Sequence, residues 1–206
     1  MYQDILRVTQ RHTRIAGKMA GTVFNPPLWA LACYRLGHCL WRADVMLFPR
    51  LLSLLGRLVS GVAIAPSARI APGALIVHGS GVVIEENVQI GPGATIYQGV
   101  GIGQRFGSTV RDGLPIIGED VTIYAGAKIL GPVRVGDRCC IGANAVVIRS
   151  FDDDTTIAGV PARAVGEHVS PITTVADGTL LRVGPPREKL PTPARAYSSS
   201  ASSGNE

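Results

Sequence analysis

Aliphatic residues recur at every sixth position through the middle of the chain. A small or apolar residue lies two positions before most of them, and glycine often follows. An α-helix repeats every 3.6 residues and a strand every 2.0, so neither accounts for this period. The pattern predicts a solenoid in which each hexapeptide forms one short strand and one turn, with the aliphatic side chain inside. The three series are Ile64, Ile70 and Ile76; Ile84, Ile90, Ile96 and Ile102; and Ile117, Ile123, Ile129, Val135, Ile141 and Val147.

The repeat divides the chain into three regions. Three hexapeptides, about 18 residues, close one triangular coil, so residues 61–160 predict about five coils. We assign residues 61–166 to this β-helix and residues 1–60 to a helical N-terminal region. Residues 167–206 are rich in Pro and Ser without a period, which predicts a disordered or loosely packed tail.

The N-terminal region has helical spacing instead of the six-residue repeat. In "NPPLWALACYRLGHCLW" the apolar positions follow the 3.6-residue period, and Asn25 followed by two prolines is a typical helix start. A second helix is predicted over "FPRLLSLLGRLVS", ending before Gly61.

Two interruptions of the repeat predict functional segments. The first is a two-residue insertion between Ile76 and Ile84, and it contains His78. The second separates Ile102 from Ile117 by fifteen positions and predicts a projecting loop. Loops on rigid scaffolds commonly carry function.

Charge and cysteine content exclude several classes of protein. The net charge of +5 comes largely from the first 60 residues, but no nucleic-acid motif accompanies it, so we expect a solvated basic face and no nucleic-acid partner. The apolar stretch 27–60 is interrupted by charges, so a helical packing face is favoured over a membrane surface and a membrane span is excluded. Four cysteines without a CxxC spacing predict reduced thiols in a cytoplasmic protein.

The motifs resemble those of one family of enzymes. The repeat with "IYAGAKILGPVRVGDRCCIGANAVV", the closing "TTIAGVPARAVG" and the segment "VHGSGVVIEE" resemble the serine acetyltransferase branch of the left-handed β-helix acyltransferases, including its sugar-directed relatives. The resemblance implies a mainly β fold, a left-handed parallel β-helix after N-terminal helices. It also implies acetyl-CoA as co-substrate, no metal, and a homotrimer or dimer of trimers with active sites between neighbouring prisms.

The resemblance places the catalytic histidine of the family on His78. Three polar positions of the serine-specific site fall on Ala63, Val77 and Leu114, which weakens the serine interpretation more than the acetyltransferase interpretation. The loop pattern that begins at Gly103 looks more like the sugar-directed relatives.

Acetyl transfer to a hydroxyl requires a base, and an imidazole ordinarily titrates near neutral pH. We therefore expect His78 to accept the hydroxyl proton. A base of this kind is oriented through its other ring nitrogen, and Glu85, Glu86 or a backbone carbonyl are the candidates. Glu86 matches a glutamate of the family, and we assign it to the catalytic group.

The resemblance also suggests how the cofactor and acceptor bind. Backbone amides near Gly103, Ala125 and Ala143 are expected to hold the pantetheine arm of CoA. The basic residue near the CoA phosphates falls on Cys140, so Arg138 or Arg163 is expected to substitute. Arg111 and Asp112 on the projecting loop are the candidate acceptor contacts.

The sequence thus predicts an acetyl-CoA-dependent O-acetyltransferase acting on a small hydroxylated acceptor, with a sugar or glycoconjugate as the first expectation. Serine O-acetyltransferase is the alternative enzyme. A catalytically silent trimeric scaffold is the alternative from another class, and retention of His78 disfavours it.

Overall fold

The computed structural model of the chain describes residues 1–9, 25–105, 107, 113–167, 173–174 and 180–181. The chain forms two units, Met1–His168 and Val169–Glu206. The first unit contains the helices and the β-helix. In the second unit, β16 (Thr173–Thr174) pairs antiparallel with β17 (Leu180–Leu181). The other residues predicted to form a disordered tail lie outside the described residues, so that expectation stays a prediction.

Helices form the N-terminal region, as predicted. They are α1 (Tyr2–Thr9), α3 (Pro26–Arg42) and α4 (Leu47–Ser60). The Asn25 side chain accepts a hydrogen bond from the Leu28 N–H at 3.1 Å, which caps the first turn of α3. Gly61 ends α4 with a left-handed φ of 71°, a conformation that glycine adopts without a side-chain clash. No helix in the described part of the chain is long and apolar enough to cross a membrane.

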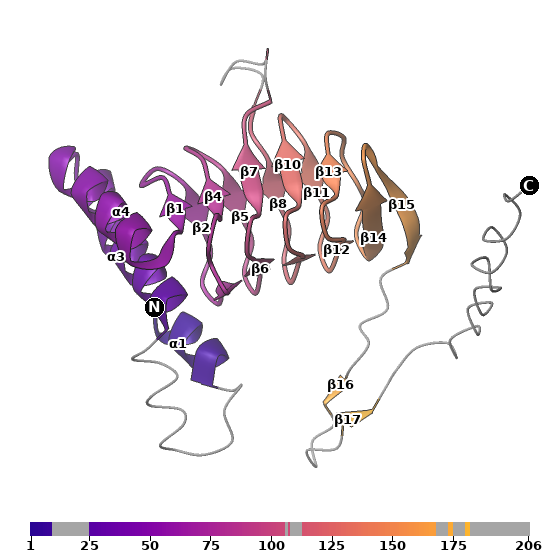
Figure 1. Ribbon diagram of the computed structural model, residues 1–206, viewed down its shortest axis with the longest axis horizontal. Helices are drawn as coiled ribbons and strands as arrows, with labels where there is room; N and C mark the ends of the chain where they lie inside the picture. The colour runs from indigo at the N-terminus through magenta and orange to yellow at the C-terminus, as the bar shows by residue number, and fades with distance from the viewer. Residues whose placement is uncertain (10–24, 106, 108–112, 168–172, 175–179, 182–206) are drawn as a thin grey trace, which may run out of the picture. The chain divides into compact units, whose positions relative to one another are not determined.

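The hexapeptides form three sheets that are the sides of a prism, and strands in successive coils are parallel (Figure 1). Sheet 1 contains β1 (Ala63–Ile64), β4 (Val83–Ile84), β7 (Gly101–Gly103), β10 (Lys128–Leu130) and β13 (Val146–Val147). Sheet 2 contains β2 (Arg69–Ile70), β5 (Gln89–Ile90), β8 (Ile116–Ile117) and β11 (Arg134–Val135). Sheet 3 contains β3 (Leu75–Val77), β6 (Thr95–Tyr97), β9 (Thr122–Ile123), β12 (Cys140–Ile141), β14 (Thr155–Gly159) and β15 (Ala162–Glu167).

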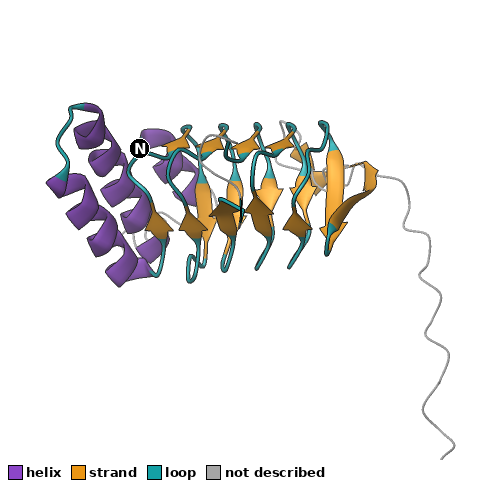
Figure 2. Ribbon diagram, turned by 90° about the horizontal axis from the view of Figure 1, so that it is seen from above, coloured by secondary structure: helices purple, strands orange, loops and turns teal. Residues whose placement is uncertain are grey.

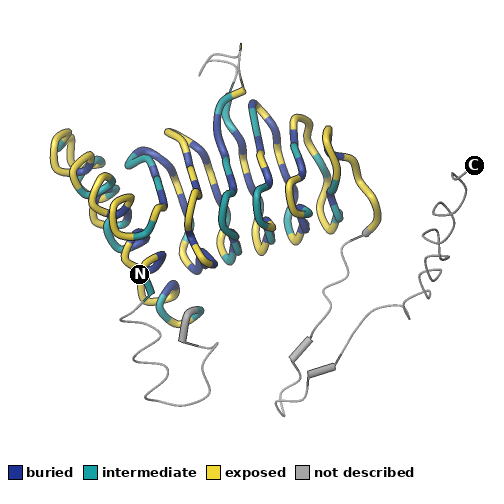
Figure 3. The backbone as a smooth tube through the Cα atoms, viewed as in Figure 1, coloured by how far each residue is buried: buried dark blue, intermediate teal, exposed yellow. Residues whose placement is uncertain are grey.

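The predicted aliphatic series fills the interior of the prism. All its members are buried, and the small or apolar residues two positions earlier are buried as well, as the alternating colours of the coils show (Figure 3). Residues at the same position of the repeat are paired in register between successive coils, for example Ile64, Ile84 and Ile102 in sheet 1. The last strand departs from the repeat, because β15 turns back and pairs antiparallel with β14.

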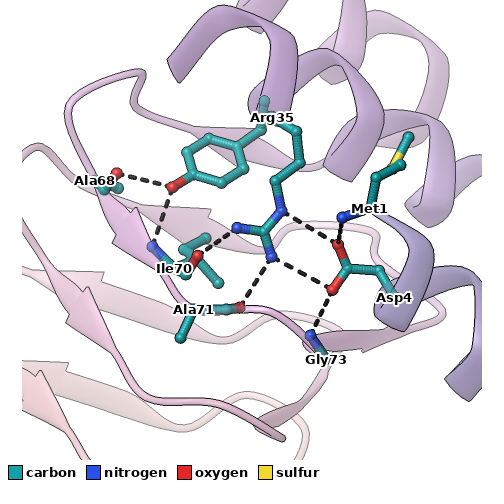
Figure 4. A network of polar contacts seen from close by, with 8 residues as sticks. Met1, Asp4, Arg35, Ala68, Ile70, Ala71 and Gly73 are labelled. Carbon is teal, nitrogen blue, oxygen red and sulfur yellow. Dashed lines mark hydrogen bonds and ion pairs between the residues drawn. The ribbon is translucent and has the colours of Figure 1, made fainter. Parts of the chain in front are cut away.

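The helices stand at the N-terminal end of the stack of coils (Figure 2). The first coil has no preceding coil to pair with, and side chains of α3 bond to its backbone instead. The Tyr34 hydroxyl donates to the Ala68 carbonyl at 2.8 Å and accepts from the Ile70 N–H at 3.0 Å. The Arg35 guanidinium donates to the carbonyls of Ile70 and Ala71 (Figure 4).

A buried carboxylate completes this end of the prism. Asp4 of α1 has no exposed surface, and its Oδ1 accepts a hydrogen bond from the Gly73 N–H at 2.8 Å. Its Oδ2 lies 3.1 Å from Arg35 Nε (Figure 4). Arg35 supplies the partner that a buried charge requires. Through these contacts Asp4 joins α1, α3 and the first coil.

Candidate active site

His78 lies on the turn that the two-residue insertion creates. It follows β3 directly and has a left-handed φ of 64°, and Gly79 and Gly81 in the same turn also have positive φ. The Ser80 N–H donates to the His78 carbonyl at 2.7 Å, which closes the turn. The imidazole is exposed and has no hydrogen bond or ion pair with any residue that the structure describes. The turn therefore leaves this side chain exposed at the surface of the single chain.

Two parts of the fold hold the His78 turn in place. A Cβ atom at Gly79 would lie 2.8 Å from Pro27 Cγ and 2.8 Å from Val62 Cγ2, so only glycine allows this close approach. Pro27 is in the first turn of α3, and Val62 begins the first coil. The sequence signal for this contact is the inserted "HGSG", which a regular coil would not need.

The His78 turn is the first of four turns stacked along one edge of the prism, between sheets 3 and 1. Backbone hydrogen bonds join them in order. The Gly99 N–H donates to Ser80 at 2.8 Å, the Gly126 N–H to Gln98 at 2.9 Å, and the Asn144 N–H to Ala125 at 2.9 Å. We call these turns, residues 78–81, 97–99, 124–126 and 142–144, the His78 edge. It places His78 on the same edge as Ala125 and Ala143, two of the four predicted cofactor-binding residues.

Two tyrosines of this edge, which sequence reasoning missed, stack on each other. The ring centroids of Tyr97 and Tyr124 are 5.2 Å apart with an interplanar angle of 25°. Burial raises the pKa of Tyr124, and the neighbouring Cys140 and Tyr97 raise it further. A comparison of equivalent positions in successive coils would have found the pair, because both residues follow the inward isoleucine of a sheet 3 strand.

A cavity of about 410 Å³ opens on the outer face of sheet 1. Ala63 and Leu114, two of the apolar replacements noted in the sequence, both line it. The third replacement, Val77, is only 7% exposed and packs with Leu28 and Leu75. We call this space the sheet 1 cavity; its lining is Ser53, Ala63, Ile64, Ala65, Val83, Ile84, Glu85, Glu86, Gln104 and Leu114.

The two candidate acids both line the sheet 1 cavity and are exposed. Glu85 Oε2 accepts a hydrogen bond from the Gln104 N–H at 2.7 Å, so its carboxylate is engaged at the start of the loop. Among the described residues, neither acid is hydrogen-bonded to the imidazole of His78. The orienting role assigned to Glu86 stays a prediction.

Of the remaining predicted site residues, Gly103 and Arg138 lie apart from the His78 edge. Arg163 lies near its last turn, because it pairs with Ala158 and Ala158 stacks on Gly142. Gly103 ends β7, at the opposite end of a sheet 1 strand from that edge. Arg163 is exposed on β15. Arg138 donates two hydrogen bonds of 2.7 Å to Asp154, which raise its pKa, so Arg163 is the stronger candidate for the CoA phosphates. Arg111 and Asp112 lie outside the described residues.

Comparisons with known proteins place the chain in a family. Residues 115–149 match the family of bacterial transferase hexapeptides (six repeats), and residues 81–106 match the hexapeptide repeat of succinyl-transferase. A serine acetyltransferase of Helicobacter pylori (strain J99) is 40% identical over 159 residues, which cover 77% of this chain and 92% of the relative. The chain belongs to the serine acetyltransferase family.

Other members of the serine acetyltransferase family show how much of the chain is shared. The relative from Synechococcus elongatus is 41% identical over 152 residues; the match covers 71% of this chain and spans 61% of the relative. The crystal structure of the Brucella abortus serine acetyltransferase in complex with coenzyme A has 32% identity and a TM-score of 0.74, and the match covers 81% of this chain and 66% of that one. These similarities confirm the family and the β-helix predicted from the sequence.

Proposed function

We propose that the chain is an acetyl-CoA-dependent O-acetyltransferase in which His78 is the general base. The observation that carries the proposal is the exposed imidazole on the same prism edge as Ala125 and Ala143. Family membership supports the cofactor, because the Brucella relative was crystallised with coenzyme A. No other histidine in the described residues lies on this edge.

The reaction follows from this arrangement. An imidazole nitrogen of His78 takes the acceptor's hydroxyl proton as the hydroxyl oxygen attacks the thioester carbonyl carbon. The carbon–sulfur bond then breaks, and the CoA thiolate takes the proton from the imidazolium. Backbone N–H groups of the His78 edge are the candidate donors to the carbonyl oxygen as negative charge develops there.

We propose L-serine as the acceptor. The relatives favour this alternative over the sugar or glycoconjugate expected first from the sequence, because those named above are serine acetyltransferases and none is sugar-directed. A neutral alcohol is the second candidate, since Ala63 and Leu114 make part of the sheet 1 cavity lining apolar. The deciding measurement is kcat/KM for L-serine beside a panel of hydroxylated sugars, read as release of the CoA thiol. Turnover with sugars and none with serine would overturn the serine assignment.

The same assay separates an enzyme from a silent scaffold. With a scaffold, the rate of thiol release would not exceed the uncatalysed rate for any acceptor, whether or not the protein binds acetyl-CoA. His78→Ala is the matched control, because loss of turnover with retained CoA binding assigns the release to this site.

Free thiols at all four cysteines agree with the cytoplasmic location proposed from the sequence.

We further propose a homotrimer or a dimer of trimers. Seven large apolar side chains on α4 are half or more exposed in the single chain, and contiguous apolar surface of this kind typically marks an interface. They are Leu47, Phe48, Leu51, Leu54, Leu55, Leu58 and Val59. A monomer in light scattering at working concentration would overturn the proposal.

A further inference from the structure

One hydrogen bond joins the second coil to the residue that follows β7. Glu85 directly follows β4, and Gln104 directly follows β7, its neighbour in sheet 1. The Gln104 N–H donates to Glu85 Oε2 at 2.7 Å, a length typical of a hydrogen bond to an ionised carboxylate. The carboxylate thus holds the first residue that leaves the regular repeat.

The residue at position 103 makes this bond possible. A Cβ atom built on Gly103 would overlap the carboxyl group of Glu85 and lie 2.6 Å from its Cγ. Any larger residue would force the Glu85 side chain away from β7. The glycine predicted to approach pantetheine is therefore covered, on its outer side, by the side chain of Glu85.

This bond helps to shape the wall of the sheet 1 cavity. Glu85, Gln104 and Leu114 all line the cavity, and Gln104 and Leu114 are near the two ends of the loop. The other end is tied by backbone, because the Gln89 N–H donates to the Pro115 carbonyl at 3.1 Å. The start of the loop thus has a side-chain anchor that a single substitution can remove.

The cavity also contains two of the positions at which the resemblance places polar groups of the acceptor site, Ala63 and Leu114. An acceptor bound at these positions would contact the wall that Glu85 helps to hold. We propose that Glu85 is a positioning residue for acceptor binding, which fixes Gln104 in the wall of the sheet 1 cavity through the Gln104 N–H. The proposal rests on the proposed acetyltransferase function.

The kinetic test compares Glu85→Ala with Glu85→Gln, since the glutamine oxygen can still accept the Gln104 hydrogen bond. We expect Glu85→Ala to raise the KM of the best acceptor by about tenfold, the scale of one lost charge-assisted hydrogen bond. The KM of acetyl-CoA should stay unchanged, and Glu85→Gln should restore most of the acceptor KM. Glu119→Ala, which removes an exposed carboxylate outside this cavity, is the control. An unchanged acceptor KM in Glu85→Ala, or equal defects in both Glu85 variants, would overturn the proposal.

A second measurement does not depend on turnover. Amide hydrogen exchange at Gln104 should accelerate in Glu85→Ala and return towards the wild-type rate in Glu85→Gln. Unchanged exchange in Glu85→Ala would refute the anchor even in an active enzyme. Faster exchange in a protein that acetylates no acceptor would instead refute the proposed function while the anchor itself stands.

Discussion

Arg35 Nε lies 3.1 Å from Oδ2 of Asp4, and the Asp4 side chain has no exposed surface. The two residues are 31 positions apart in the sequence and belong to different helices. The pair also bonds the Gly73 N–H and two carbonyls of the first coil, so its loss exposes both a charge and the backbone of the coil.

We therefore predict that Asp4→Ala lowers the free energy of unfolding by about 3–5 kcal/mol, the usual cost of leaving one partner of a buried pair alone. Urea unfolding monitored by circular dichroism measures the change. Glu119→Ala removes an exposed carboxylate and is the control. Equal stabilities of the two variants would contradict the structural role of Asp4.

The second prediction concerns the general base. His78→Ala should reduce kcat by roughly a hundredfold or more, the scale of general-base loss, and leave the affinity for acetyl-CoA almost unchanged. The melting temperature should not fall, because the imidazole is exposed and bonds no described residue. A variant with near-native turnover would show that His78 is not the base.

The third prediction compares two glycines of the β-helix. A Cβ on Gly118 would lie 2.7 Å from the Gly136 carbonyl carbon and 2.8 Å from the Asp137 nitrogen, both backbone atoms that cannot move aside. Gly118→Ala should therefore destabilise the fold by about 1–3 kcal/mol. Gly103→Ala displaces only the Glu85 side chain and should keep most of the stability while raising the acceptor KM as Glu85→Ala does. Urea unfolding with acceptor kinetics on both variants checks the contrast.

A double variant sharpens the Gly103 prediction. If both substitutions act through the same hydrogen bond, Gly103→Ala with Glu85→Ala should have nearly the acceptor KM of either single variant. Additive effects would show that Gly103 acts on another group, such as the pantetheine arm proposed from the sequence.

The fourth prediction concerns the thiols. Burial raises the pKa of Cys139 and of Cys140, whereas Cys39 is exposed. Alkylation of the native protein at neutral pH should modify Cys39 first and the adjacent pair slowly, because the thiolate is the reactive form. Mass spectrometry of timed iodoacetamide reactions gives the order, and fast modification of Cys139 would contradict the buried position.

The same shift has a pH consequence. At pH values below the ordinary thiol pKa of about 9.0, the thiols of Cys139 and Cys140 stay protonated in both the folded and the unfolded chain. The contribution of these thiols to the free energy of unfolding is therefore fully present there. Above it the unfolded thiols ionise first, and stability falls as the pH rises through the folded pKa. Cys139→Ala should make urea unfolding less sensitive to pH between about 8 and 10.

The fifth prediction addresses assembly. Leu54 and Leu58 are 52% and 76% exposed on one side of α4, and a charge there should disfavour burial against another chain. We expect the double variant Leu54→Glu, Leu58→Glu to give a smaller particle in light scattering than the wild type. Arg50→Glu, at another exposed α4 position, is the control for added negative charge. An unchanged particle mass would show that this face is not the interface.

Local patterns of the sequence predict most of the fold. The six-residue period identified the inward residues, and Asn25 marked the start of α3, because both signals depend on neighbours in the chain. The inserted "HGSG" identified the turn of His78 for the same reason. These features need only backbone geometry and the size of nearby side chains.

Contacts between distant positions were less predictable. Tyr34 and Arg35 looked like ordinary helical residues, and only the structure shows that they bond the first coil. Glu85 was considered as a partner for His78, whereas it bonds Gln104. The repeat does place Glu85 and Gly103 in neighbouring coils, so their proximity could be predicted. The direction in which the long Glu85 side chain points does not follow from the repeat.

The side-chain bonds from α3 to the first coil also make that end of the prism unavailable to other strands. A parallel stack of coils ends in a row of open backbone groups, which is a template for a strand from another molecule. The side chains of Tyr34 and Arg35 donate hydrogen bonds to three carbonyls of this row, those of Ala68, Ile70 and Ala71. The N-terminal helices thus act against end-to-end growth into fibres, a hazard that the flat, repetitive coils would otherwise carry.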